Sequence, residues 1–138
     1  MKIKIIDYSK PGEVTLPKRA HYNDAGADVY NPATVYIKDG ETANIGLGFG
    51  VAIPDGHFGL VYVRSSMAAK GLSVELPPID PGYTGEIHAI VHNHSGKTVC
   101  LEKGDRIGQL VVQPVIYADF VEEFTEERGT GAFGSTGK

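Results

Sequence analysis

Short runs of apolar and aromatic residues, separated by glycine, proline, aspartate and asparagine, recur along the whole 138-residue chain. Val, Ile, Tyr and Phe favour strands, and the residues between the runs are those that turns prefer. Many short strands at this spacing are typical of a β-sandwich, a jelly roll or a barrel. The pattern predicts strands over residues 2–6, 34–37, 43–47, 50–53, 58–63, 87–91, 98–101 and 106–115.

Three further segments are less regular. Residues 65–70 predict one short helix, with a serine at its start and Gly71 after its end. The segment DAGADVY, residues 24–30, predicts a turn that leads into a strand. Residues 119–127 fit either a strand or a turn. The expected fold class is therefore all-β, a jelly-roll-like sandwich or barrel.

Composition indicates one globular domain over residues 1–138, with a core over about 1–127 and an arm over 128–138. Hydrophobic residues make up 41% of the chain and charged residues 22%, which is the balance of a folded domain rather than a disordered one. There is no internal repeat. One core should therefore organise the fold.

Charge and cysteine content restrict the partners and the compartment. The net charge is −4, whereas nucleic-acid binders usually carry a basic excess, so we expect no nucleic-acid partner. A small polyphosphate would need positive charge in one cleft only. Cys100 is the single cysteine, and no apolar run approaches the length of a membrane span or a signal peptide. We expect a cytoplasmic protein without a membrane partner.

The arm, residues 128–138, has a composition unlike the rest of the chain. Four of its eleven residues are glycine, and one phenylalanine stands among small polar residues. Such a segment buries little apolar area, so we expect it to be flexible until a ligand orders it. Two interpretations stay open: a flexible terminus, or a segment whose amides, hydroxyls, arginine and phenyl ring contact a nucleotide.

Two other segments carry candidate site residues. Arg64 and Ser65 precede the predicted helix, where free backbone amides attract anions, although a plain helix cap with a surface arginine explains them equally well. Asp80 lies in a tight Asp-Pro-Gly-Tyr turn, where most aspartates only form the turn. For Asp105 and Arg106, a structural salt bridge is the preferred interpretation.

Considered together, five segments resemble the five motifs of the trimeric dUTPase family, in order and over nearly the whole chain. They are AGAD at 25–28, RSSMA at 64–68, IDPGYTGEI at 79–87, GDRIGQL at 104–110 and RGTGAFGSTG at 128–137. The third and fifth are the most specific. The resemblance implies a jelly-roll-like subunit of the dUTPase β-clip type and a homotrimer in which three chains build each site. It also implies hydrolysis of dUTP to dUMP and pyrophosphate, which keeps uracil out of DNA and supplies dUMP for thymidylate synthesis.

The resemblance implies a role for several residues of the third motif. Asp80 matches the aspartate that activates the water attacking the α-phosphorus. Tyr83 matches the tyrosine that packs against the deoxyribose, where its ring would clash with a 2′-hydroxyl. Backbone groups of the same hairpin, including Ile79 and Gly82, are expected to pair with the edge of uracil.

The remaining motifs imply contacts with the phosphates, the base and a metal ion. Mg²⁺ would bridge the three phosphates, held mainly by substrate and water. Asp28 would either touch that hydrated ion through water or support the fold beside Tyr83. Phosphate contacts are implied for Arg64, Ser65, Gln109 and the Ser66 amide. In the arm, Arg128, Ser135 and Thr136 should reach the γ-phosphate, with Phe133 and Gly134 at the uracil ring.

The sequence departs from the family pattern at several positions. Ser66 and Ala132 stand where glycine is common, and Pro81–Gly82 replaces a pair that more often ends in aspartate. Residues 74–78, VELPP, lack the asparagine or glycines that relatives often carry near the base. We therefore expect uracil recognition to depend more heavily on the backbone.

Two alternative functions remain. A dCTP deaminase shares the fold and similar RSS and IDPG segments, but it needs a proton-shuttling glutamate where this chain has Ile90. A non-catalytic nucleotide- or protein-binding module could use the same scaffold, although a complete arm together with Asp80 and Tyr83 argues against decay of the site. We favour water attack in line with the leaving pyrophosphate and no covalent intermediate.

Overall fold

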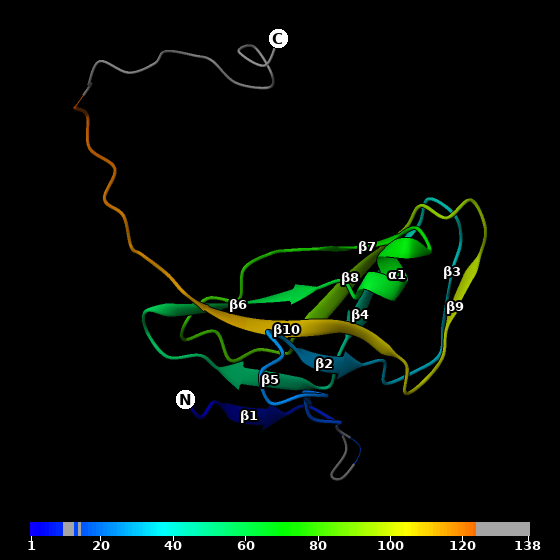
Figure 1. Ribbon diagram of the computed structural model, residues 1–138, viewed down its shortest axis with the longest axis horizontal. Coiled ribbons are helices and arrows are strands. Elements are labelled where there is room, and N and C mark those ends of the chain that lie inside the picture. Colours follow the sequence, from blue (N-terminus) through cyan, green and yellow to red (C-terminus); the bar gives the residue numbers. More distant parts are fainter. Residues whose placement is uncertain (10–12, 14, 124–138) are drawn as a thin grey trace.

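The computed structural model describes residues 1–9, 13 and 15–123 of the chain (Figure 1). Within these residues the chain forms short antiparallel strands and one short helix, and no sheet closes into a barrel. The elements are β1 (Lys4–Asp7), β2 (Ala27–Tyr30), β3 (Val35–Ile37), β4 (Thr42–Gly46), β5 (Phe49–Ala52), β6 (His57–Tyr62), α1 (Ser65–Ala69), β7 (Leu72–Glu75), β8 (His88–Asn93), β9 (Val99–Leu101) and β10 (Arg106–Pro114).

Strands that are distant in the sequence pair with one another. The two larger sheets have the orders β2-β10-β6 and β4-β8-β7, and two smaller sheets consist of β1-β5 and β3-β9. In the register of β10, Gln109 is the Cα partner of both Asp28 on β2 and Tyr62 on β6. This pairing brings the first and fourth sequence motifs side by side.

The core is formed by alternate residues of these strands. On β8, Ala89, Val91 and Asn93 are buried, whereas the residues between them are half-buried. This period of two is the one that a pleated strand imposes. The largest fully buried side chains are Phe49, Ile37, Ile87, Ile107, Val29, Val51, Val91, Asn31 and Asn93.

The two buried asparagines connect the small β3-β9 sheet to the core. Asn93 Nδ2 donates to the carbonyl oxygens of Ile37 and Lys97, each at 2.8 Å. Asn31 Nδ2 donates to the carbonyl oxygen of Leu101 at 2.9 Å. These bonds satisfy amides that would otherwise be costly to bury.

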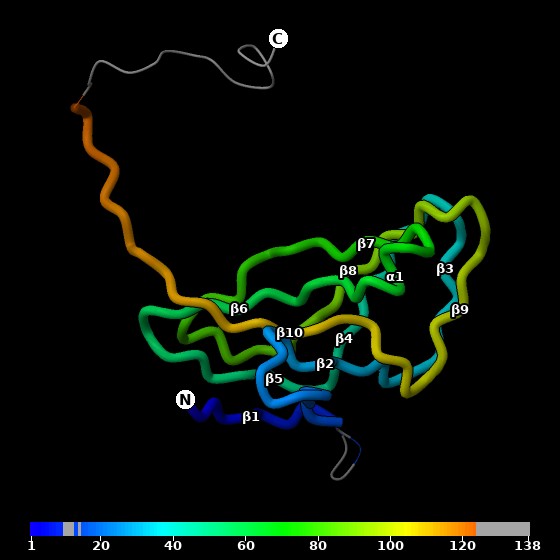
Figure 2. Tube along the Cα trace, in the orientation of Figure 1, coloured from blue at the N-terminus to red at the C-terminus, as the bar shows by residue number. Residues whose placement is uncertain are grey.

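After β10 the chain leaves the body as an extended segment over residues 115–123 (Figure 2). The Val115 amide donates to the Gly56 carbonyl at 2.9 Å, and the Tyr117 hydroxyl accepts from the Gly56 amide at 2.8 Å. The sequence left open whether residues 119–127 form a strand or a turn. Within residues 119–123, which the structure describes, the chain forms no strand. No helix in the described part of the chain is long and apolar enough to cross a bilayer.

The expected all-β class is confirmed, and each predicted strand matches a strand whose ends differ by at most two residues. The strand β7 was missed, since its four residues follow the helix and precede two prolines that mask the pattern. The serine cap was wrong: Arg64 is the N-cap residue of α1, and it makes no side-chain cap bond. Gly71 follows the helix with φ +88°, as its position predicted.

Candidate functional site

A pocket of about 220 Å³ lies along the hairpin formed by β7 and β8, and we call it the Asp80 pocket. The chain between these strands is held at Ile79, which exchanges two backbone hydrogen bonds of 2.8 and 3.0 Å with Gly59. The next residues then turn, with the Tyr83 amide donating to the Asp80 carbonyl at 3.2 Å and Gly82 at φ +84°. The lining residues are Val61, Glu75, Pro77, Pro78, Ile79, Asp80, Tyr83, Glu86, Ile87, His88 and Ile90.

Three carboxylates line this pocket, and their environments differ. Glu86 is committed to the fold, because its Oε1 accepts from the Gly48 amide at 2.9 Å and its Oε2 lies 3.6 Å from His88 Nε2. The carboxylates of Asp80 and Glu75 bond to no other residue that the structure describes. Tyr83 is 48% exposed, and its hydroxyl donates to the Glu86 carbonyl at 3.2 Å. Among the described residues, the pocket thus offers two acids without a partner beside an aromatic ring whose hydroxyl is bonded.

A second pocket, of about 460 Å³, collects positive charge, and we call it the Arg64 pocket. Arg64, Lys70 and Arg106 all contribute to it. The Arg64 guanidinium also donates from Nη1 to the Arg106 carbonyl at 3.3 Å, which ties the start of α1 to the start of β10. The other lining residues are Tyr30, Ser66, Met67, Leu72, Val99, Cys100, Leu101, Gly104 and Asp105.

Asp28 stands behind the two arginines. Its Oδ1 lies 3.6 Å from Arg64 Nε, and its Oδ2 lies 3.4 Å from Arg106 Nη1. Arg106 therefore forms the expected salt bridge, but with Asp28 rather than with its neighbour Asp105, whose Oδ2 accepts from the Glu102 amide. This arrangement balances the Asp28 charge and fixes both guanidinium groups.

Gln109 lies beside the first motif. A Cβ on Gly26 would come within 2.9 Å of the Gln109 side chain, so only glycine leaves room for it. Ser65 and Ser66 are exposed in the first turn of α1. Arg64 and Ser66 of the second motif line the Arg64 pocket together with Arg106 of the fourth, whereas Ser65 and Gln109 are not among its lining residues.

The lining of the Arg64 pocket includes Cys100. Tyr36 is its Cα partner across β3 and β9. The pKa of the Tyr36 phenol is raised. The main cause is a hydrogen bond to Cys100, followed by the electrostatic interaction with the Cys100 side chain. A phenol is already neutral near pH 7, so the raised pKa only extends the neutral range of Tyr36 to higher pH.

The expected site residues fall into two groups within one chain. Ile79, Asp80 and Tyr83 line the Asp80 pocket, with Gly82 in the turn between them, whereas Arg64 and Ser66 line the Arg64 pocket. The two pockets share no lining residue. The arm residues Arg128, Phe133, Gly134, Ser135 and Thr136 lie outside the described residues.

Sequence reasoning missed several lining residues of the Asp80 pocket. Glu86 belongs to the IDPGYTGEI segment but was given no role, whereas Glu75 and His88 lie outside all five motifs, and Glu75 ends a strand that was not predicted. The only available signal was the pair of charged residues around the IDPGYTG segment. Arg106 and Asp28 were considered separately, although they belong to one ion-pair network.

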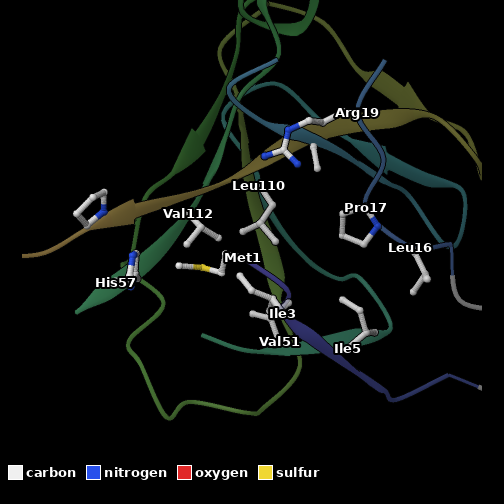
Figure 3. Close-up of a pocket in the computed structure, with 12 residues that line it drawn as sticks. Met1, Ile3, Ile5, Leu16, Pro17, Arg19, Val51, His57, Leu110 and Val112 are labelled. Carbon is white, nitrogen blue, oxygen red and sulfur yellow. The ribbon is translucent and has the colours of Figure 1, made fainter. Parts of the chain in front are cut away.

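A third, apolar groove of about 690 Å³ lies on the face where β1 and β5 approach β10 (Figure 3). Met1, Ile3, Val51, Leu110 and Val112 point towards one another in it. The remaining lining residues are Ile5, Leu16, Pro17, Arg19, Ala27, His57 and Pro114.

Exposed apolar side chains also occur on the extended segment over residues 115–123. Ile116 is 89% exposed, Phe120 97% and Val121 72%, which is unusual for large apolar residues so close together. The described part of the chain thus carries an open apolar groove and an exposed apolar segment.

Comparison with known proteins gives a consistent result. A family model described as dUTPase matches residues 12–137. A deoxyuridine 5′-triphosphate nucleotidohydrolase of Nocardia farcinica is 46% identical over 134 residues, covering 92% of this chain and 81% of the relative. A protein of the same name from Corynebacterium glutamicum is 43% identical over 143 residues, covering 99% and 95%.

Solved structures agree in fold. The dUTPase of Staphylococcus bacteriophage 80alpha with dUpNHpp has a TM-score of 0.88 at 30% identity and covers 99% of both chains. A variant dUTPase from phage phi11 of S. aureus, described with a structural Mg(II) ion, has a TM-score of 0.80 at 27% identity, covering 90% of this chain and 99% of that one.

Proposed function

Because the chain belongs to the dUTPase family and is a dUTP diphosphatase, we propose that Asp80 activates the water that attacks the α-phosphorus of dUTP. The bond from water oxygen to this phosphorus forms as the bond to the departing pyrophosphate breaks, and dUMP remains. The reaction removes dUTP, which keeps uracil out of DNA, and supplies dUMP for thymidylate synthesis. We place it in the cytoplasm, where the single cysteine stays reduced.

The observation that supports this role is the Asp80 carboxylate, which lies in a pocket beside Tyr83 and has no partner in the described part of the chain. Such a carboxylate is available to orient a water and accept its proton, and a positioned base contributes roughly 100- to 10,000-fold to a rate. The tight turn holds it in place. Tyr83 would pack against the deoxyribose, with its hydroxyl bonded to the Glu86 carbonyl. A 2′-hydroxyl on the sugar would then clash with the Tyr83 ring.

Positive charge for the triphosphate comes from the Arg64 pocket. We propose that Arg64 contacts the phosphates, together with the Ser65 hydroxyl, the Ser66 amide and the Gln109 side chain. The arm would add Arg128, Ser135 and Thr136 at the γ-phosphate, and Phe133 and Gly134 over the base. Closure of the arm would exclude water and complete the site.

Mg²⁺ fits this site as an ion held chiefly by the substrate. No cluster of three His, Cys, Asp or Glu side chains that could hold a metal occurs among the described residues, and Mg²⁺ commonly keeps several waters. Asp28 would reach such an ion only through water, since its carboxylate is already paired with Arg64 and Arg106. When bound, the ion would neutralise charge on the three phosphates.

The separation of the two pockets supports a homotrimer. A nucleotide must meet both Asp80 and Arg64, yet these residues line different pockets of one chain. We propose that the Asp80 pocket of one subunit faces the Arg64 pocket of the next, and that a third subunit contributes the arm. The exposed segment 115–123 would lie in the apolar groove of a neighbouring subunit, burying apolar surface on both sides.

The test is a pyrophosphate-release assay with dUTP, dCTP, dTTP and UTP side by side. We expect release from dUTP, little from the other three, and loss of activity with EDTA that Mg²⁺ restores. Ammonia from dCTP would indicate the deaminase instead. Ile90, at the position where that enzyme needs an acid, lines the Asp80 pocket. Absence of both products would indicate a binding module.

A further inference from the structure

Glu75 is the one carboxylate of the Asp80 pocket without an assigned role. It is the last residue of β7 and the Cα partner of Ile90 on β8, and both side chains line the pocket. Its carboxylate bonds to no other described residue, in contrast to that of Glu86. We propose that Glu75 accepts a hydrogen bond from N3–H of uracil and thereby selects uracil over cytosine, an inference that rests on the proposed function.

Charge decides which part of a nucleotide can approach Glu75. An ionised carboxylate only accepts hydrogen bonds, and it repels phosphate oxygens. The triphosphate must therefore extend from Asp80 away from Glu75, towards positive charge. The nucleoside then occupies the part of the pocket that contains Glu75.

The neighbouring polar groups are already engaged. His88 Nδ1 lies 2.8 Å from Asn44 Oδ1, and because an amide oxygen only accepts, Nδ1 carries the proton. His88 Nε2 lies beside Glu86, whose other oxygen accepts from Gly48. The remaining walls at this end are apolar, formed by Pro77, Pro78 and Ile90 among others. Because Asp80 is proposed to hold the attacking water, Glu75 is the remaining carboxylate of this pocket without a partner among the described residues, and it is available to the base.

Uracil and cytosine differ at the atom that Glu75 would meet. Uracil has a hydrogen on N3 and can donate it, whereas cytosine has a lone pair there that a carboxylate repels. A site built for one hydrogen-bond pattern rejects a ligand that leaves its polar group unpaired. Backbone pairing at the hairpin and the Glu75 contact would then act on the same base.

The experiment compares kcat/KM for dUTP and dCTP in the full-length enzyme and in Glu75→Ala and Glu75→Gln. For Glu75→Ala we expect the dUTP value to fall about 10- to 100-fold, mainly through KM, as for a lost bond to a charged group. For Glu75→Gln, an amide can accept from uracil or donate to N3 of cytosine. Its dCTP value should rise roughly tenfold or more, with the dUTP value within about threefold of wild type.

Glu41→Gln is the matched control. It removes the same charge from the exposed turn after β3, and its amide oxygen can still accept from the Lys38 amide as the carboxylate does at 3.0 Å. We expect its values for dUTP and dCTP to equal those of the wild type. Circular dichroism spectra and the unfolding midpoint of each variant check that the fold is retained.

Two results would overturn the inference. Unchanged selectivity and unchanged KM in Glu75→Ala would make Glu75 a solvated residue at the rim. An effect on dUTP that vanishes with the 3′-deoxy analogue would assign the contact to the 3′-hydroxyl instead. If the wild-type chain releases no pyrophosphate from dUTP, the proposed function itself fails, and this outcome is distinct from both.

Discussion

The Nε atom of Arg64 lies 3.6 Å from the Oδ1 atom of Asp28, although the two residues are on different elements. Asp28 belongs to β2, and Arg64 is the residue before α1. The side chains are partly buried, with 17% of Asp28 and 28% of Arg64 exposed. The carboxylate therefore sets the direction of the guanidinium that we propose for phosphate binding.

Replacing Asp28 by Asn should weaken dUTP binding through Arg64. A neutral amide holds a guanidinium less firmly than a carboxylate, so we expect KM to rise about tenfold and kcat to change less. Asp24→Asn is the control, since that carboxylate pairs within its own turn with His21. A variant with normal KM but a higher Mg²⁺ requirement would instead connect Asp28 with the metal ion.

Asp80→Asn should remove the base and preserve the pocket. The amide cannot accept a proton from water, so turnover should fall by about 100-fold or more, while affinity for dUTP changes little. Steady-state kinetics and direct titration with dUpNHpp measure the two quantities separately. Near-normal turnover would contradict the role of this carboxylate.

Tyr83→Ala should relax the rejection of UTP. Without the ring there is space for a 2′-hydroxyl, so the ratio of kcat/KM values for UTP and dUTP should rise roughly tenfold. Tyr83→Phe is the control, because it loses only the 3.2 Å bond to the Glu86 carbonyl and keeps the ring. If UTP were still rejected by the alanine variant, the sugar would be recognised elsewhere.

Deletion of residues 128–138 should abolish activity and leave the assembly intact. The segment is rich in glycine and adds little apolar surface, while its arginine, hydroxyls and phenyl ring are proposed to close the site. Pyrophosphate release and sedimentation of the shortened chain provide the two measurements. Retained activity would show that the arm plays no part in the reaction.

Phe120→Asp should disrupt the proposed trimer. The ring is 97% exposed in the isolated chain, so the change should not affect folding, but a charge in the apolar groove of a neighbour is unfavourable. Sedimentation should show smaller species and pyrophosphate release should fall. Tyr22→Asp alters a residue that is 94% exposed and outside the groove, and it should sediment as the wild type does.

The positions of the strands, the turns and the family membership could be predicted from local patterns. Alternating burial on β8 and the glycine after α1 follow from the geometry of a strand and of a helix end, which nearby residues specify. The strand β7 could not be foreseen in this way. Its four residues pair with β8, and this pairing stabilises their extended conformation. In the sequence, the two prolines shortly after the strand hide its pattern.

Residue types and motif order by themselves determined that this chain is an all-β member of the dUTPase family with candidate acids, arginines and an arm. Tertiary structure alone decided that Asp28 pairs with Arg64 and Arg106, that Glu75 shares a pocket with Asp80, and that Asp80 and Arg64 line separate pockets. The physical reason is distance along the chain. Contacts between such remote residues depend on which strands pair and in which register, and the local sequence does not specify this choice.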